Sequence, residues 1–209
     1  MGAGLLAIWN AITPEQEAQF NAWYDGEHIS ERLALPGFLG ARRYRDTAAP
    51  DRYCALYDTD SPAALSSPEY MARLADPTPA TRAIMAHFRD MHRAVCEVVL
   101  DAGAPRAAGR ALVLVEIGEN AADGVSRERA AALAARLGLR IRVAVPDAAP
   151  SQVRTPEQRL RGAPDKLPST LLVVEGEAPQ SCLQAAGELA PGRQPMSFEL
   201  LYAKNRAQA

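Results

Sequence analysis

His28 is the side chain in this sequence best suited to move protons. An imidazole with an ordinary pKa of about 6.5 both accepts and donates a proton near neutral pH. Tyr24 precedes it by four residues, so on a helix the phenol shares a face with the imidazole and can hydrogen-bond the same ligand. The alternative is a histidine at a helix end that interacts only with local backbone and the helix dipole. We take His28 and Tyr24 as candidate catalytic residues.

Asn10 is the third candidate catalytic residue, because its amide interrupts the otherwise apolar run at residues 5–12. A buried amide must find a hydrogen-bond partner in the backbone, in water or in a ligand. Trp9 would point to the opposite face of a strand, so only one of the two can face the interior of a barrel. We keep Trp9 as a candidate substrate-binding residue.

Arginine and tyrosine side chains near this region could bind an aromatic acid. A guanidinium suits a carboxylate or a phenolate, although most arginines are exposed to solvent. Two tyrosines four residues apart on a strand share a face, where they either pack in the core or line a pocket for an aromatic ligand. The candidate substrate-binding residues are Arg32, Arg43, Tyr53 and Tyr57.

The sequence contains no glycine-rich phosphate loop, dinucleotide fingerprint, nucleophile elbow or spaced set of metal ligands. We therefore predict no cofactor and no metal. With 23 basic and 25 acidic residues the net charge is −2, which offers no basic surface for nucleic acid or membrane. The three cysteines are far apart and are interpreted as buried apolar residues. No signal peptide or membrane span is recognisable, so we expect a cytoplasmic protein.

The elements that must position these residues follow the order β-α-β-β-α-β in residues 1–100. Strands are predicted at 5–12, 41–46, 52–58 and 93–100 from apolar runs and alternation. A helix begins at Thr13-Pro14 and is predicted to end near His28. Three further Ser-Pro or Thr-Pro signals between residues 61 and 79 predict a broken helical stretch ending near Phe88.

The same order repeats after a small-residue linker at 101–110. Strands are predicted at 111–117, 139–145, 170–175 and 197–203, with helices beginning at Ser126 and Ser181. The two middle strands of this half are separated by the proline-rich stretch 146–169, with a short helix at 156–161. This stretch is either a lid over a pocket or a solvated surface excursion. The half from 111 to 209 contains no histidine, and we expect it to be structural.

A βαββαβ unit has helices on one face of its sheet only, so a second sheet must cover the other face. The near-continuous apolarity of residues 5–12 and 112–117 fits strands buried on both faces. We therefore predict an α+β fold of two tandem repeats that form a barrel within one chain, with helices outside. The alternative is that each half pairs with another chain, for instance in a homodimer.

The run from Trp23 to Tyr44 follows the pattern W-Y-x-x-E-H-x-x-E-R-L-x-x-P-G-F-x-x-A-R-R-Y. It resembles uncharacterised bacterial members of the dimeric α/β-barrel superfamily, with ferredoxin-like repeats, related to EthD-like proteins. The resemblance covers about the first hundred residues by motif and the rest by topology. It implies a pocket between sheet and helices. Enzymes of that superfamily include quinol monooxygenases, muconolactone-type isomerases, polyketide cyclases, haem-handling proteins and aldoxime dehydratases.

The leading functional hypothesis is a cofactor-independent lyase, isomerase or cyclase acting on a small aromatic or polyketide-like acid. His28 would transfer the proton, and Asn10 or Tyr24 would hold the carbonyl or enolate oxygen. One alternative is a non-catalytic protein that binds a small molecule in the same pocket. Another is a cofactor-free quinol monooxygenase.

Overall fold

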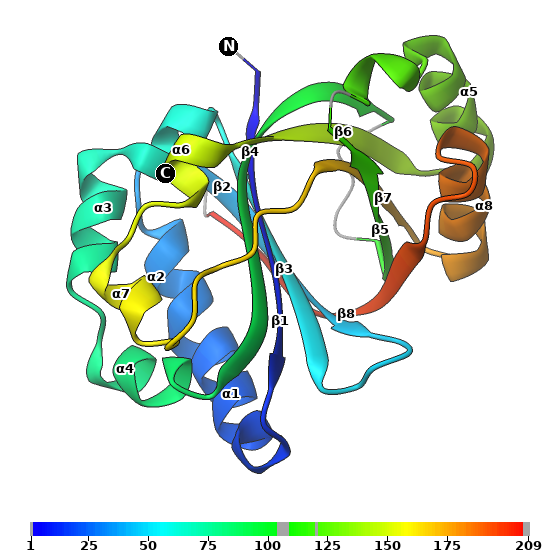
Figure 1. Ribbon diagram of the computed structural model, residues 1–209. Helices are drawn as coiled ribbons and strands as arrows, with labels where there is room; N and C mark the ends of the chain where they lie inside the picture. The colour runs from blue at the N-terminus through cyan, green and yellow to red at the C-terminus, as the bar shows by residue number, and fades with distance from the viewer. Residues whose placement is uncertain (1, 104–108, 120, 207–209) are drawn as a thin grey trace.

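Eight strands form one closed antiparallel barrel in the computed structural model, which describes residues 2–103, 109–119 and 121–206 (Figure 1). Around the barrel the strand order is β1-β3-β2-β8-β5-β7-β6-β4. The strands are β1 (Gly4–Ile12), β2 (Phe38–Asp46), β3 (Arg52–Thr59), β4 (Phe88–Ala102), β5 (Ala111–Gly118), β6 (Arg140–Asp147), β7 (Thr170–Gly176) and β8 (Pro195–Asn205).

The two halves of the barrel have the same topology. The first half is ordered β4-β1-β3-β2 and the second β8-β5-β7-β6, so each is a βαββαβ unit. Their edges join through antiparallel pairing of β2 with β8 and of β4 with β6. The predicted fold of two tandem repeats closing a barrel within one chain is therefore confirmed. The two sheets face each other across the interior and also share hydrogen-bonded edges.

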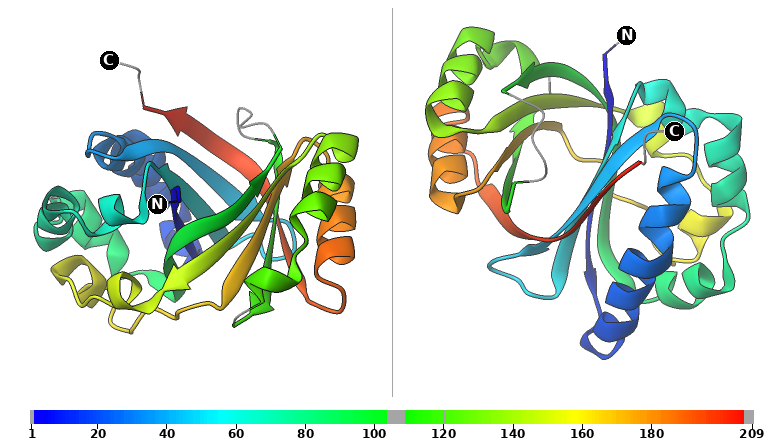
Figure 2. Two further views of the ribbon diagram at one scale, coloured as in Figure 1. Left: turned by 90° about the horizontal axis from the view of Figure 1, so that it is seen from above. Right: turned by 180° about the vertical axis from the view of Figure 1, so that it is seen from behind.

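The helices lie outside the barrel, in a separate group on each half (Figures 1 and 2). The first half carries α1 (Glu17–Trp23), α2 (Ile29–Leu33), α3 (Pro68–Ala75) and α4 (Pro79–Met85), and the second carries α5 (Arg127–Leu137) and α8 (Pro179–Leu189). Two short helices, α6 (Ala148–Ser151) and α7 (Pro156–Arg159), belong to the segment 148–169 that links β6 to β7. We call this segment the β6–β7 connection.

Strand β1 shows why the halves assemble in this way. All nine of its residues are buried. Leu5 and Ala7 pack in the barrel interior, whereas Leu6 and Ile8 pack outward beneath the helices. A strand with apolar residues on both faces needs cover on both sides. The first-half helices provide the outer cover and the second-half sheet the inner cover.

An ionic cluster lies inside the barrel where the two halves meet. Arg42 pairs with Asp58 at 2.6 Å and with Glu175 at 2.7 Å, and Arg142 pairs with both carboxylates at 2.7 Å. The Tyr44 hydroxyl donates to Glu175 at 2.8 Å. Burial alone would raise the pKa of Asp58, but Arg142 and Arg42 hold that pKa well below its usual range. The cluster therefore connects β2 and β3 of one half to β6 and β7 of the other.

Strand β4 is longer than the sequence indicated. It was predicted at 93–100 but runs from Phe88 to Ala102, so residues 101 and 102 of the expected linker belong to the strand. Residues 104–108 of that linker lie outside the described residues. The extra length lets β4 pair with β1 over residues 88–97 and with β6 over residues 95–102.

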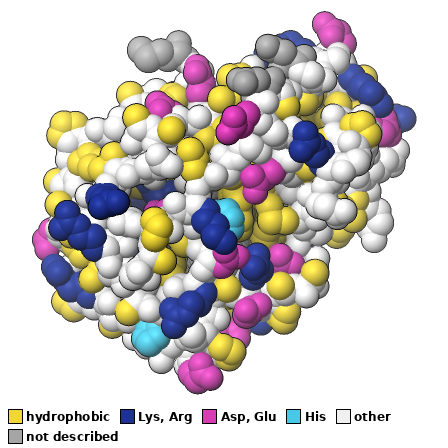
Figure 3. All heavy atoms as spheres, viewed as in Figure 1, with side chains coloured by type: hydrophobic (Ala, Val, Ile, Leu, Met, Phe, Trp, Pro, Cys, Tyr) yellow, Lys and Arg dark blue, Asp and Glu magenta, His cyan; other side chains and the backbone are white. Residues whose placement is uncertain are grey.

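Charged and apolar side chains are interspersed on the face of the molecule shown in Figure 3. Lys and Arg side chains there lie next to Asp and Glu side chains, as the near-zero net charge leads one to expect. Within the described ranges, no helix is long and apolar enough to cross a membrane.

Candidate functional site

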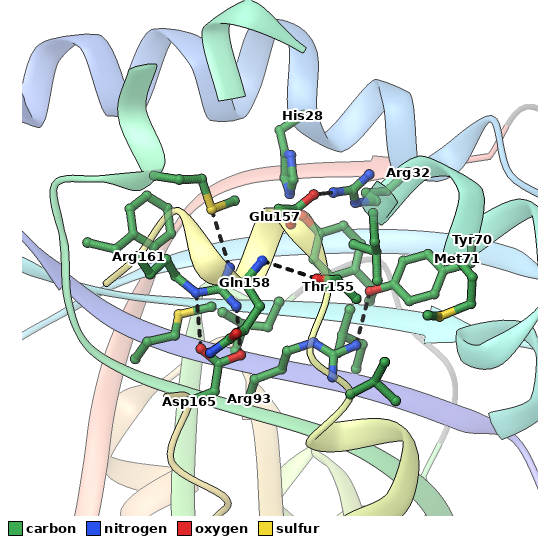
Figure 4. A pocket seen from close by; sticks show the side chains of 18 of the residues that line it. His28, Arg32, Tyr70, Met71, Arg93, Thr155, Glu157, Gln158, Arg161 and Asp165 are labelled. Atoms are coloured by element: carbon green, nitrogen blue, oxygen red, sulfur yellow. Dashed lines mark hydrogen bonds and ion pairs between the residues drawn. The ribbon is translucent and has the colours of Figure 1, made fainter. Parts of the chain in front are cut away.

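A pocket lies between the outer face of the first-half sheet and the helices that cover it (Figure 4). Its floor is formed by apolar side chains of β1, β3 and β4, and the β6–β7 connection closes one side. The lining residues are Leu6, Ile8, Trp23, Tyr24, His28, Arg32, Tyr57, Tyr70, Met71, Leu74, Met85, Phe88, Met91, Arg93, Pro150, Val153, Thr155, Glu157, Gln158, Arg161 and Asp165.

The helix that carries His28 does not end there. Residues Tyr24–His28 form a π-helical turn between α1 and α2, in which the Ile29 N–H donates to the Tyr24 carbonyl. The predicted helix end near His28 is therefore wrong, because the chain continues helically to Leu33. A π-turn is wider than an α-turn and is frequent at functional sites. Here it places both the Trp23 and the Tyr24 ring against the His28 imidazole, at centroid distances of 4.3 and 5.1 Å.

His28 is buried and projects into the pocket from the helix above it (Figure 4). Its Nδ1 has no hydrogen-bond partner among the described residues, and the nearest carboxylate oxygen, of Glu31, is 4.0 Å away. Burial, together with the positive charges of Arg32 and Arg161, lowers the pKa of His28 well below its ordinary value. The imidazole is therefore neutral near pH 7 and can accept a proton or a hydrogen bond.

Two tyrosine hydroxyls lie near this imidazole. Burial raises the pKa of Tyr24 to about 12, against the opposing effects of the Tyr57 hydroxyl and Arg43. Burial also raises the pKa of Tyr57, whose hydroxyl has no hydrogen-bond acceptor in the described part of the protein. Both phenols therefore stay protonated, which is the form of the hydroxyl group that donates hydrogen bonds.

The β6–β7 connection is fixed across the pocket at both ends and in the middle. Near its start the Ser151 hydroxyl accepts from the Val95 N–H at 2.9 Å, and near its end the Lys166 N–H donates to the Met91 carbonyl at 2.8 Å. In the middle Glu157 pairs with Arg32 at 2.6 Å, and both side chains are buried. Of the two interpretations of this segment, the observed position is that of a lid over the pocket.

A second pair on the connection adds charge to the pocket wall. Arg161 pairs with Asp165 at 2.7 Å, four residues away on the same segment. Figure 4 shows this pair on the wall beside Gln158. The second half of the chain thus supplies polar residues to a site that lies over the first half.

Four of the candidate site residues line this pocket, namely Tyr24, His28, Arg32 and Tyr57. Trp9 instead faces the barrel interior, with its indole stacked on the His92 ring at a centroid distance of 4.7 Å. Asn10 is buried and donates to the Ala11 carbonyl at 3.1 Å, which is a backbone partner rather than a ligand contact.

Arg43 and Tyr53 lie next to the pocket wall and do not line it. The Arg43 guanidinium packs on the Phe20, Tyr24 and Tyr53 rings, each at a centroid distance of 5.0 Å, and pairs with Asp25 at 2.8 Å. The Tyr53 hydroxyl donates to Glu17 at 2.6 Å. Both side chains therefore hold α1 on the sheet.

Sequence reasoning missed the charged residues that line the pocket from β4 and from the connection. These are Arg93, Glu157, Arg161 and Asp165. Glu157 pairs with a residue 125 positions away, so no local pattern identifies it. Arg93 did carry one signal, since it is a charged residue on the strand face that also carries the buried apolar residues Met91 and Val95.

The free space in the pocket is small. The cavity measures about 30 Å³, far below the roughly 300–1,000 Å³ of a typical ligand pocket. An aromatic ligand therefore requires the pocket to widen, and the connection is the wall that lacks sheet pairing along most of its length. Haem would require the pocket to widen much further, since a porphyrin is several times larger than a single aromatic ring. No group of three or more His, Cys, Asp or Glu residues in the described ranges could hold a metal ion.

Solved structures share this fold across almost the whole chain. A candidate monooxygenase from Fusobacterium nucleatum superposes with a TM-score of 0.62 at 9% identity, covering 98% of this chain and 95% of that one. The fold is that of the dimeric α/β-barrel proteins. Two further structures agree with this assignment. An anthrone oxidase-like protein superposes with a TM-score of 0.55 at 10% identity, covering 99% of this chain and 94% of that one. A candidate chlorite dismutase superposes with a TM-score of 0.53 at 11% identity, covering 97% of this chain and 96% of that one.

No protein family and no curated protein matches the sequence itself. At 9–11% identity the structural neighbours establish the fold alone and leave the reaction open. The relation to EthD-like proteins that the Trp23–Tyr44 motif suggests stays a prediction.

Proposed function

We propose that this protein is a small-molecule enzyme that removes a proton from an aromatic or polyketide-like hydroxy compound, with His28 as the base. The observation that carries the proposal is the buried imidazole of His28, which lines the pocket and whose Nδ1 has no partner in the described structure. A neutral imidazole is the form that accepts a proton.

The charges around the pocket suit this step. Burial and, after it, the charges of Arg32 and Arg161 lower the pKa of His28, and the same two positive charges would lower the pKa of a bound phenol or enol. After proton transfer the imidazolium and the substrate anion stabilise each other, which compensates for the low basicity of the free imidazole. Burial keeps the phenols of Tyr24 and Tyr57 protonated, and in this proposal they donate to the developing oxyanion.

The pocket lining favours a flat, apolar substrate. Aromatic rings from helices and strands line it, with methionine side chains that adapt to ring shape. These residues are Trp23, Tyr24, Tyr57, Tyr70, Phe88, Met71, Met85 and Met91.

Loss of the hydroxyl proton of an enol or phenol to His28 leaves an enolate or phenolate, in which a ring or chain carbon shares the negative charge and reacts as the carbanion. In the lead candidate the proton taken by His28 returns to the substrate. An isomerase delivers it to another carbon atom. In a cyclase, the carbanion attacks a second carbonyl carbon of the same substrate, and the carbonyl oxygen takes the proton. In a lyase, the carbanion expels a leaving group, which takes the proton. None of these outcomes needs a redox cofactor.

The second candidate is cofactor-free oxygenation, which the names of two structural neighbours favour. The carbanion is then oxidised by O2 as co-reactant. A CH2 group between two aromatic rings becomes C=O, one oxygen atom enters the product and the other leaves as water. Deprotonation by His28 is the first step of both candidates, so His28 variants test them together.

The test is a turnover assay on phenolic acids, polyketide-like 1,3-dicarbonyl acids, quinols and anthrones. Absorbance changes, deuterium uptake from D2O and O2 consumption are followed for the wild type, His28→Gln and His87→Gln. His87 lies outside the pocket and serves as the matched control. We expect kcat to fall by about 10²–10⁴-fold in His28→Gln and to stay unchanged in His87→Gln.

Oxygen consumption separates the two candidates, because only the oxygenase uses O2. A His28→Gln variant with wild-type turnover overturns the role of His28. Binding of these compounds without turnover of any of them means that the pocket serves a non-catalytic binding protein.

A further inference from the structure

Arg93 is a buried cation in the pocket wall that pairs with no carboxylate in the described part of the chain. It lies on β4 and is 9% exposed. Its guanidinium donates to the carbonyls of Pro150 and Ser151 at 3.1 and 3.0 Å and to the Tyr70 hydroxyl at 3.3 Å. All three acceptors are neutral groups.

The other two arginines of the pocket differ in this respect. Arg32 pairs with Glu157 and Arg161 with Asp165, at 2.6 and 2.7 Å. The pocket is therefore lined by three arginines and two carboxylates, and the unmatched charge is that of Arg93. Because an uncompensated buried charge is costly, an anion that enters the pocket is attracted to this guanidinium.

The guanidinium also has donors to spare. Five N–H groups are present, and three hydrogen bonds account for both Nη1 hydrogens and one Nη2 hydrogen. Among the described residues, Nε and the second Nη2 hydrogen have no acceptor. These are donors of the kind that bind a carboxylate.

We infer that Arg93 binds the carboxylate of an aromatic hydroxy acid whose hydroxyl group lies at His28. The inference rests on the proposed function and adds the anionic group of the substrate and the residue that holds it. Figure 4 shows His28 and Arg93 on opposite sides of the pocket, and the residues that line this pocket include aromatic and methionine side chains. A substrate with its acid at one end and its hydroxyl at the other matches this arrangement.

A purely structural role for Arg93 makes a different prediction. Its bonds to Pro150 and Ser151 hold the start of the β6–β7 connection, so its loss could loosen the lid and weaken every ligand equally. A carboxylate-binding role weakens only ligands that carry the negative charge. Comparing an acid with its neutral ester therefore separates the two.

The experiment measures dissociation constants by calorimetry for three acids and their methyl esters. The acids are 4-hydroxybenzoate, 3-(4-hydroxyphenyl)propanoate and 6-hydroxy-2-naphthoate, which differ in length and ring number and carry the hydroxyl at the end opposite the carboxylate. The proteins are the wild type, Arg93→Gln, Arg93→Lys and Arg89→Gln. Arg89 is an exposed arginine of the same strand, so its variant makes the same change in net charge outside the pocket.

We expect the wild type and Arg89→Gln to bind at least one acid about tenfold or more tightly than its ester, a margin of about 1.4 kcal/mol. Arg93→Gln should remove this preference while leaving ester affinity within about twofold, and Arg93→Lys should restore part of it. Equal affinities for acid and ester in the wild type, an equal loss for both in Arg93→Gln, or no binding by any acid would overturn the inference.

Failure of the inference and failure of the proposed function are distinguishable. If acids bind through Arg93 but His28→Gln leaves turnover unchanged, the carboxylate site stands and the role of His28 is wrong. If His28→Gln abolishes turnover of a substrate whose acid and ester bind equally, the role of His28 stands and the carboxylate site at Arg93 is wrong.

Discussion

The low pKa of His28 makes the stability of this protein depend on pH in a way that one substitution should remove. In the folded state His28 stays neutral because of burial and the charges of Arg32 and Arg161, whereas in the unfolded chain it titrates at about 6.5. Below that pH the unfolded state therefore binds a proton that the folded state does not. The free energy of unfolding then falls as the pH falls, and this contribution is fully present only above the unfolded pKa.

The size of the effect follows from the linkage relation. If folded His28 takes up no proton, lowering the pH from about 7.5 to about 5 costs about 2 kcal/mol, and the slope approaches about 1.4 kcal/mol per pH unit. His28→Gln has no group that titrates there, so its stability should decline less over this range. Urea denaturation at several pH values measures the difference between the two proteins.

His87→Gln is the control for this experiment. It removes one imidazole from the unfolded chain just as His28→Gln does, so a comparison of the two variants isolates the folded environment of His28. The carboxylates of the ionic cluster are common to all three proteins and cancel. Parallel stability curves for the wild type and His28→Gln would refute the argument, since they would mean that folded His28 takes up its proton at an ordinary pH.

Three other substitutions test the lid, the π-turn and the ionic cluster. Glu157→Ala removes the buried partner of Arg32, so hydrogen exchange should become faster across residues 148–166 while the strands keep their protection. Unchanged exchange across residues 148–166 would show that this ion pair does not hold the lid. Gly26→Ala places a methyl group in open space on an exposed helical turn. Urea denaturation should therefore show a free energy of unfolding that is higher by about 0.5–1 kcal/mol, and a lower value would contradict this. Asp58→Asn removes one carboxylate from the buried arginines of the cluster, so the free energy of unfolding should fall by about 3–5 kcal/mol. A fall of less than about 1 kcal/mol would show that the cluster does not join the halves.

Most of the fold could be predicted from local sequence patterns. Strands such as β1 and β6 follow directly from apolar runs and alternation, and the repeated order of elements predicts two copies of one unit. The length of β4 could not be predicted, because Arg89, Asp90 and His92 interrupt its apolar pattern. Its pairing with β6 supplies the hydrogen bonds that extend it, and such long-range pairing leaves no local signal.

The site was only partly predictable, for a related reason. His28 and Tyr24 lie four residues apart, so their shared helix face could be recognised, although the helix was expected to end near His28 and instead continues through a π-turn to Arg32 and Leu33. Tyr57 was recognised from strand alternation. Asn10 and Trp9 were chosen for residue type, and the strand register then placed them away from the pocket.

The topology explains why a segment of the second half covers a pocket of the first. The β6–β7 connection begins where β6 ends, and β6 pairs with β4, whose residues Phe88, Met91 and Arg93 form part of the pocket floor. A long excursion from that point therefore starts beside the open side of the pocket, and its backbone meets β4 again at Lys166. The equivalent link in the first half, between β2 and β3, is a short turn that reaches no such surface. One repeat thus provides the floor and His28, and the other provides the cover with Glu157 and Arg161, so access to His28 depends on the half that contains no histidine.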